Sequence, residues 1–202
     1  MPTKPKKFTR DKESKISSIV QATVDLIEEK GYSSFSVDDL PNRAKLSIGT
    51  VYRYFPNGKS DILREIITRN NQVLMDMITL YDSNEASFYD FWKHVIESYL
   101  RGHREGKFSL TAIEYSMGGD SQFTEILKPL LIAFFQKLVG IISGFETFSS
   151  LPEKELYTRV VMAFGVAGLF VKSHVNSSLF KSDEKLVDYL VEVSRVTFEM
   201  ES

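Results

Sequence analysis

Apolar residues recur at helical spacing along most of the chain, and no segment alternates in the manner of a β-strand. The first apolar stripe includes Ile16, Val20 and Ile27. Gly31 follows it and suits the left-handed position after a helix. Further helices are expected at 37–43, 48–55, 60–81, 87–104, 107–118, 121–144, 152–176 and 183–200. The pattern therefore predicts an all-α fold, with Pro129 inside one helix and expected to kink it.

Two short helices near the N-terminus have recognisable starts. Ser36 is followed three residues later by Asp39, in the arrangement of a capping box, and Phe35 and Leu40 occupy the positions of a hydrophobic staple. Ser47 suits the cap of the next helix. Two short helices joined by a tight turn and braced by the first helix have the spacing of a helix-turn-helix.

Two residues of this unit are unusual for their positions. Counted from a cap at Ser36, Pro41 is the fifth helical residue, where it removes a backbone hydrogen bond, so the second helix is expected to be tightened or bent. Lys45 lies in the turn, where a left-handed conformation would cost a residue other than glycine about 1 kcal/mol. We therefore expect the turn to differ locally from one that contains glycine.

The third helix presents residues that are suited to DNA. Gly49 and Thr50 are small enough for close approach to a groove, and the Thr50 side chain can meet a base edge. Tyrosine hydroxyls and basic side chains can bind phosphate. The predicted DNA-binding residues are Ser36, Lys45, Ser47, Ile48, Gly49, Thr50, Tyr52, Arg53, Tyr54 and Lys59. From these residues alone, a purely structural helical hairpin is the alternative, since such units occur in both settings.

The balance of basic and acidic residues changes at about residue 60, just after the helix-turn-helix. Residues 1–60 contain 11 Lys and Arg against 7 Asp and Glu, whereas residues 61–202 contain 14 against 20. We therefore expect a DNA-binding domain at 1–60, which includes a basic arm, and a ligand-binding and dimerisation domain at 61–202, with the helix 60–81 connecting the two. The basic arm either contacts phosphates or is a solvated tail.

Several classes of protein are excluded or disfavoured. The chain has no cysteine, which excludes disulfides, thiol nucleophiles and cysteine metal sites. The common nucleotide-binding and hydrolase motifs are missing from the sequence, so we expect no catalytic residues, no metal site and no cofactor. The longest uncharged apolar run, Val160 to Val171, has 12 residues, which is short of the roughly 20 that a membrane span needs. We expect a soluble, cytoplasmic protein.

The larger C-terminal part is rich in aromatic residues, which indicate either a plain core or an apolar ligand pocket between helices. The candidate ligand-binding residues are Trp92, Ile96, Tyr99, Ile113, Met117, Leu127, Leu131, Phe134 and Phe135. A basic cluster at 101–107 either binds an anionic headgroup or pairs with a helix dipole. The last two helices have apolar ridges that pack within one chain or form a dimer seam, for which the candidates are Leu156, Val160, Phe164, Gly168, Leu186, Leu190 and Val193.

About 50 residues, from Ile16 through Ile62, resemble the N-terminal domain of the tetracycline-repressor (TetR) family of transcriptional regulators. The resemblance rests on Glu29-Lys30-Gly31-Tyr32, on Ser36-Val37-Asp38-Asp39-Leu40 and above all on Gly49-Thr50-Val51-Tyr52-Arg53-Tyr54-Phe55-Pro56. It implies a homodimeric regulator that binds a palindromic operator in double-stranded DNA and whose C-terminal helical domain binds a small ligand that releases the DNA. The remainder fits the family only in length, helicity and the placement of breaks.

The sequence thus predicts a ligand-responsive DNA-binding regulator, in first place a repressor that is released by a small, largely apolar effector, with acyl compounds among the candidates. The alternative is a small-ligand carrier or helical enzyme that kept a vestigial helix-turn-helix. The acidic, apolar C-terminal part is compatible with that alternative, and the basic N-terminal part argues against it.

Overall fold

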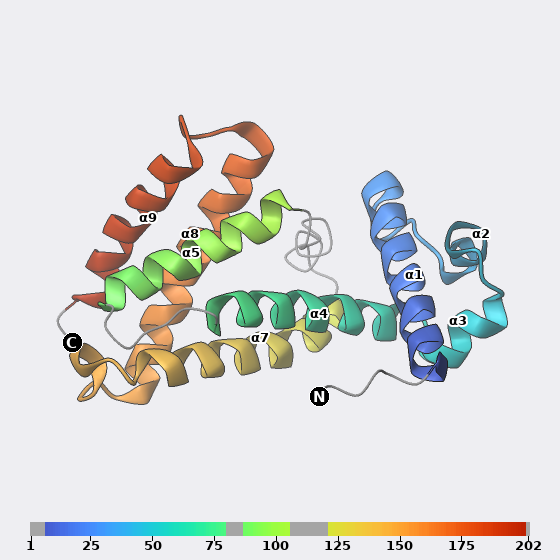
Figure 1. The fold of residues 1–202 in the computed structure, drawn as a ribbon, viewed down its shortest axis with the longest axis horizontal. Coiled ribbons are helices and arrows are strands. Elements are labelled where there is room, and N and C mark those ends of the chain that lie inside the picture. Colours follow the sequence, from blue (N-terminus) through green and yellow to red (C-terminus); the bar gives the residue numbers. More distant parts are fainter. Residues whose placement is uncertain (1–6, 80–86, 106–120, 201–202) are drawn as a thin grey trace. The chain divides into compact units, whose positions relative to one another are not determined.

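The computed structural model describes residues 7–79, 87–105 and 121–200, and within these ranges the chain forms helices and no strand (Figure 1). The predicted all-α fold is confirmed, while the helix predicted at 107–118 lies outside the described residues. The helices are α1 (Lys7–Lys30), the 3-10 turn η1 (Val37–Asp39), α2 (Leu40–Ala44), α3 (Ile48–Tyr54), α4 (Lys59–Thr79), α5 (Phe88–Arg104), α7 (Ser121–Ile142), the 3-10 turn η2 (Glu146–Phe148), α8 (Glu153–Ser177) and α9 (Asp183–Phe198).

Contacts within the chain define two compact units whose boundary falls inside α4. The first unit extends to Arg69 and takes in α7 up to Lys128, and the second begins at Asn70 and takes in the chain from Pro129 onward. The domain boundary predicted at residue 60 lies at the start of the same helix. Since α4 is uninterrupted from Lys59 to Thr79, it belongs to both units.

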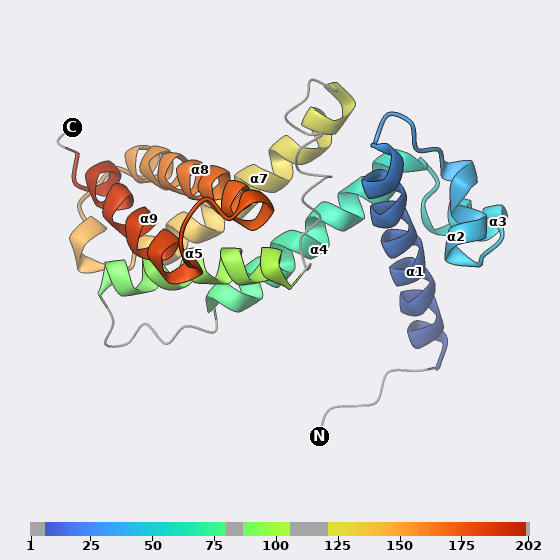
Figure 2. The same cartoon turned by 90° about the horizontal axis from the view of Figure 1, so that it is seen from above.

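In the first unit, α2 and α3 lie together on one side of α1 (Figures 1 and 2). The core between them is built from side chains without solvent exposure, namely Ile19, Ile27, Leu40 and Val51. Ile19 was not recognised in the sequence, because the polar pair before it obscures the stripe. Gly31 ends α1 with φ +78°, the left-handed conformation that its position predicted.

In the second unit, α5 packs against α8 and α9 (Figure 2). Its core is aromatic at the end where these helices meet η2: the ring of Phe88 lies 4.5 Å from that of Phe148 and 4.7 Å from that of Phe198, both edge to face. Trp92 is fully buried and satisfies its indole N–H by donating to the Ser194 hydroxyl at 2.9 Å. Edge-to-face rings fill this core in the geometry that their quadrupoles favour.

Helix α8 is long and rich in apolar residues. Among the described helices it is long and apolar enough to cross a membrane by length and composition, a test that the core helix of a soluble protein also passes. One face, which includes Leu156, Val160 and Val171, is buried in the core of the second unit. On the opposite side of α8, two large apolar side chains are exposed, Met162 and Leu169.

Candidate nucleic-acid interface

The start of the helix-turn-helix is fixed by a reciprocal cap at Ser36. The Ser36 hydroxyl accepts a hydrogen bond from the Asp38 N–H at 3.3 Å, and the Asp39 carboxylate accepts one from the Ser36 N–H at 2.7 Å. Phe35 and Leu40 are both buried, as a hydrophobic staple requires. The capping box predicted at Ser36 and Asp39 is confirmed, and it sets the direction in which the chain enters α2.

Pro41 corrects one expectation. It lies in the first turn of α2 and not in the interior of a helix, because Val37–Asp39 forms a 3-10 turn and α2 begins only at Leu40. A proline is tolerated in a first turn, where its nitrogen needs no intrahelical acceptor. The tightening predicted for the second helix is therefore the 3-10 turn that precedes Pro41, and α2 itself is only five residues long.

The turn between α2 and α3 keeps its left-handed residue although that residue is lysine. Lys45 has φ 55° and ψ 43°, and its N–H bonds to the Pro41 carbonyl. The Leu46 N–H bonds to the same carbonyl at 3.1 Å. The conformation costs about 1 kcal/mol in a residue with a Cβ. In return it leaves an exposed ammonium beside the start of α3.

Helix α3 begins at a serine cap that also orients a neighbouring hydroxyl. The Ser47 hydroxyl accepts from the Thr50 N–H at 3.2 Å and lies 2.9 Å from the Thr50 hydroxyl. Val51 and Phe55 are buried and attach the helix to the unit's core. The cap therefore fixes both the first turn of α3 and the position of the Thr50 side chain, which is half-buried.

The remaining face of α3 is open. Ile48 is 39% exposed and Tyr52 is 45% exposed, Gly49 and Arg53 are exposed, and Tyr54 is half-buried. A Cβ placed on Gly49 would meet nothing within 4 Å. Packing within the described chain therefore does not require glycine there, although glycine costs an exposed helix about 1 kcal/mol relative to alanine. The open space at Gly49 is consistent with close approach of a partner.

Two of the predicted basic contacts already have partners inside the unit. Arg53 donates from Nη2 to the Tyr54 hydroxyl at 2.8 Å, and its guanidinium lies 4.8 Å from the centre of that ring. Lys59 is half-buried, donates to the Tyr32 carbonyl at 3.1 Å and lies 4.8 Å from the ring centres of Tyr32 and Phe35. Lys59 therefore contributes to holding the start of α4 on this unit.

Ion pairs attach α2 to the end of α1. The Lys30 ammonium lies 2.6 Å from the Asp39 carboxylate, and Arg43 pairs with Glu29. The bond from Lys30, together with the bond from the Ser36 N–H, lowers the pKa of Asp39 below its usual value, so the pair stays charged near neutral pH. Helix α1 contributes the positive charge to one pair and the negative charge to the other. If α2 were shifted along α1, like charges would meet, so the two pairs favour the observed position of α2.

The candidate ligand-binding residues that the structure describes range from buried to exposed. Trp92, Ile96, Phe134 and Phe135 are buried, Tyr99 and Leu127 are half-buried, and Leu131 is exposed. Ile113 and Met117 lie outside the described residues. Phe164 connects part of this group, because its ring lies 5.0 Å from Tyr99, 5.3 Å from Phe134 and 5.6 Å from Phe135. Burial raises the pKa of Tyr99 to about 12, which keeps its hydroxyl neutral.

The basic cluster at the end of α5 is less basic than its sequence indicates. His103 is 5% exposed, and burial, aided by the nearby Lys172 charge, lowers its pKa to about 4. Its imidazole is therefore neutral at pH 7 and adds no charge for an anion. Arg101 and Arg104 are exposed and lie in the last turn of the helix, where a positive charge pairs favourably with the helix dipole. Residues 106–107 lie outside the described chain.

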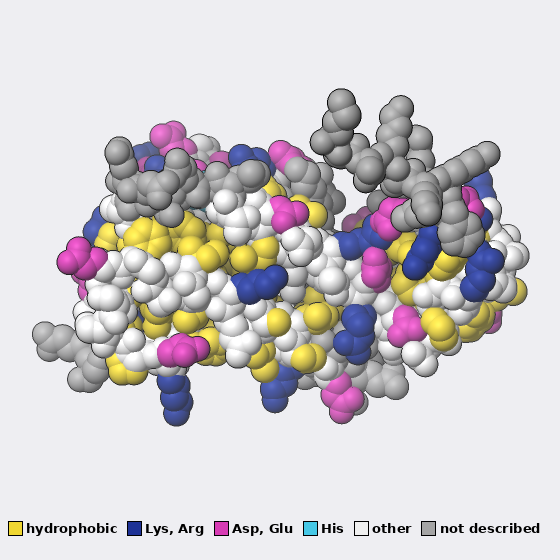
Figure 3. Space-filling model, turned by 60° about the horizontal axis from the view of Figure 1, so that its bottom comes forward, with side chains coloured by type: hydrophobic (Ala, Val, Ile, Leu, Met, Phe, Trp, Pro, Cys, Tyr) yellow, Lys and Arg dark blue, Asp and Glu magenta, His cyan; other side chains and the backbone are white. Residues whose placement is uncertain are grey.

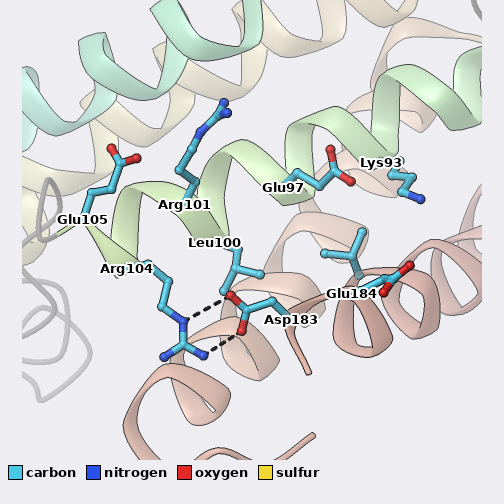
Figure 4. A pocket seen from close by; sticks show the side chains of 9 residues that line it. Lys93, Glu97, Leu100, Arg101, Arg104, Glu105, Asp183 and Glu184 are labelled. Carbon is cyan, nitrogen blue, oxygen red and sulfur yellow. Dashed lines mark hydrogen bonds and ion pairs between the residues drawn. The ribbon is translucent and has the colours of Figure 1, made fainter. Parts of the chain in front are cut away.

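A groove between α5 and α9 brings Arg104 of the basic cluster against Asp183, which sequence reasoning did not single out (Figure 4). Arg104 donates to Asp183 at 2.7 Å, and the Asp183 carboxylate also lies 3.0 Å from Nε2 of the buried His174. The Phe180 N–H donates to the other ring nitrogen of His174 at 3.0 Å, which leaves Nε2 to carry the proton. Chiefly through Arg104, these bonds lower the pKa of Asp183. The cluster anchors the α8–α9 turn to α5.

Four of the seven candidate dimer residues are buried within a single chain. Leu156, Val160, Leu186 and Leu190 are each at most 1% exposed and belong to the core of the second unit. The ridges that they form point inward, so these side chains are unavailable to a partner. Phe164, Gly168 and Val193 are half-buried, and a Cβ on Gly168 would lie 3.6 Å from the Tyr99 hydroxyl of the same chain.

The exposed apolar side chains of α8 and α9 form a different set. Met162 and Leu169 on α8 are 51% and 64% exposed, and Tyr189 and Val196 on α9 are 47% and 71% exposed. The space-filling view shows hydrophobic side chains gathered in patches on the face of the molecule that it presents (Figure 3). Gly165 lies between Met162 and Leu169, and a Cβ placed there would meet nothing within 4 Å. Met162 and Leu169 were not singled out in the sequence, because small and polar residues interrupt the apolar pattern on this side of α8.

The fold and the surface of α3 define the class of the protein: a helical protein with an N-terminal helix-turn-helix unit. Residues 19–66 match the family profile of bacterial regulatory proteins of the tetR family. The chain is also similar in fold to a putative TetR-family regulator from Syntrophomonas wolfei, with a TM-score of 0.77 and 16% identity, covering 94% of this chain and 97% of that one.

Two further solved structures have the same fold. A TetR-family regulator from Streptomyces coelicolor is 21% identical, with a TM-score of 0.65 over 92% of this chain and 98% of that chain. The fatty acid degradation regulator FadR from Bacillus halodurans is 20% identical, with a TM-score of 0.65 over 97% of each chain. Among curated proteins no relative of this chain was found.

The profile match confirms the resemblance noted in the sequence for residues 19–66, and the solved structures show that the whole chain has the fold of TetR-family regulators. The profile match covers the capped helix-turn-helix and the beginning of α4. The likeness over the rest of the chain is one of fold.

Proposed function

We propose that this chain is a homodimeric, effector-responsive repressor of the cytoplasm that binds a palindromic operator through α3. The observation that supports this most directly is the open face of α3, where Gly49 has no neighbour that would contact a Cβ and the Thr50 hydroxyl is held by the Ser47 cap. A helix end kept small and polar, at a cost in helix stability, fits the floor of a major groove.

The exposed residues divide into two roles on DNA. Thr50, Gly49 and Ile48 are at the N-terminal end of α3, and we assign them to base edges and thymine methyl groups. Tyr52, Arg53 and Tyr54, with Ser36, Ser47, Lys45 and Lys59, are assigned to the phosphate backbone. Phosphate contacts set the register of the helix, and base contacts provide the discrimination between sequences.

Dimerisation is assigned to the exposed face of α8 and α9. Met162, Gly165 and Leu169 recur at helical spacing on α8, and Tyr189 and Val196 are exposed on α9. Apolar side chains of this number gain from burial, and glycine at position 165 allows a second helix to approach closely. Two copies joined by this face would present two α3 helices to successive major grooves about 34–36 Å apart.

The effector is proposed to be small and largely apolar. Support comes from the ring contacts of Phe164 with Tyr99, Phe134 and Phe135, which give α5, α7 and α8 an aromatic junction that an apolar compound could enter. A structural neighbour from Bacillus halodurans is described as a fatty acid degradation regulator, which keeps acyl compounds among the candidates.

The switch is proposed to act through α4, the helix shared by both units. An effector that contacts the part of α4 beyond Asn70 would displace this helix and alter the spacing of the two reading helices, which are the α3 helices of the two protomers. A coupling free energy of about 1–3 kcal/mol changes operator affinity roughly 5–150-fold, which suffices for regulation.

The test begins with the purified protein and fragmented DNA from the source genome. Bound fragments are recovered at modest ionic strength and sequenced, and we expect a palindromic site with two half-sites one helical turn apart. Failure to retain any genomic duplex would refute the proposal and would favour a ligand carrier with an inactive helix-turn-helix.

A single substitution then tests the role of α3. Gly49→Ala is expected to raise the free energy of unfolding by about 0.5–1 kcal/mol, because alanine is the better helix former, and to weaken operator binding at least about 10-fold, because the methyl group occupies space needed by DNA. Gly140→Ala is the matched control, since a Cβ at Gly140 on α7 also meets nothing within 4 Å. The control is expected to stabilise the protein without changing operator affinity.

A further inference from the structure

Arg69 joins two helices of the first unit with all three types of nitrogen in its guanidinium. Its Nε donates to Glu65 on the same helix at 2.7 Å. Its Nη1 donates to the Ser17 hydroxyl at 3.0 Å, and its Nη2 donates to the Glu13 carboxylate at 2.6 Å, both on α1. The rigid, planar fork of arginine makes such a set of bonds directional, in contrast to a lysine ammonium.

The position of Arg69 along α4 is as informative as its bonds. Within α4, Arg69 is the last residue of the first compact unit, and Asn70 is the first residue of the second. On the far side of that boundary, Leu74, Met75 and Ile78 of the same helix are buried in the core of the second unit. Arg69 is therefore bonded to α1 at the point where α4 passes from one unit into the other.

Helix α1 continues this connection to the reading helix. At its other end, Glu29 pairs with Arg43 and Lys30 with Asp39, so α1 is ion-paired to α2 as well as to α4. The turn at Lys45 then leads directly into α3. The apolar contacts of Ile62, Leu63 and Ile66 also hold α4 in this unit, but apolar packing is not directional.

We propose that Arg69 is a positioning residue, which fixes the angle between α1 and α4 and so passes movements of α4 to the reading helix α3. This inference rests on the proposed function, because it assigns a residue to the coupling step. Without the fork, the N-terminal unit would still fold and its α3 would still fit one half-site. The two reading helices of a dimer would, however, lose their fixed spacing.

The first experiment compares two DNA duplexes at fixed salt: the full palindromic operator and a single half-site. Arg69→Gln is expected to weaken binding to the full operator about 5–10-fold and to leave half-site affinity within about twofold, a difference at the lower end of typical coupling energies. Arg64→Gln is the matched control, since Arg64 is an exposed arginine on the same helix. It removes the same charge and should change both affinities by one common factor. Equal losses on both duplexes for Arg69→Gln, or no loss on either, would overturn the proposal.

The second experiment does not depend on DNA. The chain has no cysteine, so Glu28→Cys on α1 and Thr68→Cys on α4, both exposed, can carry a pair of nitroxide labels. The distribution of distances between the two labels should be narrow in the labelled protein without further substitutions. It should broaden in Arg69→Gln and in Glu13→Gln, which weakens only one of the Arg69 bonds, but not in Arg64→Gln. If the width of the distance distribution is unchanged in both Arg69→Gln and Glu13→Gln, the positioning role of Arg69 is refuted, even if operator binding is demonstrated. A protein that binds no operator but shows the broadening would instead refute the proposed function alone.

Discussion

The two units of this chain hold their helices in place by different means. In the first, α2 and α3 have only five and seven residues, too few to be stable as isolated helices, and they depend on the Ser36 and Ser47 caps and on the Lys30–Asp39 and Glu29–Arg43 ion pairs. In the second, helices of 16 to 25 residues pack through a large aromatic and aliphatic core.

This difference explains why only one unit is recognisable from sequence. Caps and left-handed turns require particular residue types at fixed spacings. A helix-turn-helix built from them therefore has a sequence pattern that a family profile can match, here at 19–66. An apolar core accepts many combinations of side chains at constant volume. Over 92–97% of the chain, the solved neighbours accordingly share the fold at identities of 21% or less.

The largest expected effect contrasts one aromatic side chain from each unit. Trp92→Ala should lower the free energy of unfolding by about 3–5 kcal/mol, because it empties a fully buried site and leaves the Ser194 hydroxyl without its donor. Tyr52→Ala, at an exposed position of α3, should cost about 1 kcal/mol or less and weaken operator binding instead. Chemical denaturation followed by circular dichroism gives both values. Similar losses of stability in the two variants would contradict the contrast.

Acid should act on the second unit first, since all three histidines lie there and the pKa of the buried His103 is about 4. The unfolded imidazole binds a proton below about pH 6.5, whereas the folded one resists it, so stability is full above pH 6.5 and is lost as the pH falls toward 4. We expect a loss of about 2–3 kcal/mol between pH 7 and pH 4.5. In His103→Phe this part of the loss should vanish. If His103→Phe loses as much stability between pH 7 and pH 4.5 as the unsubstituted protein does, groups other than His103 cause the loss.

On DNA, Thr50 and Lys59 should respond differently. Thr50→Ala is expected to cost about 1–3 kcal/mol at one base position and to blunt discrimination there. Lys59→Ala should weaken binding to all sequences and reduce the salt slope by about one unit. It should also lower the stability of the first unit, because it removes the bond to the Tyr32 carbonyl. Titrations against operator variants at several salt concentrations separate these outcomes, and identical behaviour of the two variants would refute the division of roles.

The smallest effect compares the two described residues other than glycine with positive φ, one in each unit: Lys45 at 55° and Ser178 at 50°. Replacing either by glycine relieves the left-handed strain and should raise the free energy of unfolding by about 0.5–1 kcal/mol. Only Lys45→Gly should also weaken DNA binding, by the loss of one phosphate contact. Equal DNA affinity in both variants would remove Lys45 from the interface.

Particular residues show where sequence reasoning succeeded and where it stopped. Ser36 with Asp39, Ser47 and Gly31 act within a few residues of themselves, and their caps and turn were predictable from local spacing. The dimer candidates Leu156, Val160, Leu186 and Leu190 are buried in the core of their own chain, and the sequence pattern did not show which surface covers them. An amphipathic stripe shows that a helix has a side to bury, but it does not identify the surface that covers it.

What the sequence by itself determined, therefore, is the helical class, the helix-turn-helix and the resemblance of residues 19–66 to the TetR family, because each of these depends on periodicity or on signals a few residues apart. The tertiary structure alone decided which apolar faces of α8 and α9 are internal, that Lys59 bonds to Tyr32, that His103 is neutral and that Arg69 reaches Glu13 across 56 positions of sequence. Burial, pairing and pKa depend on what distant segments bring together, and no local pattern contains that information.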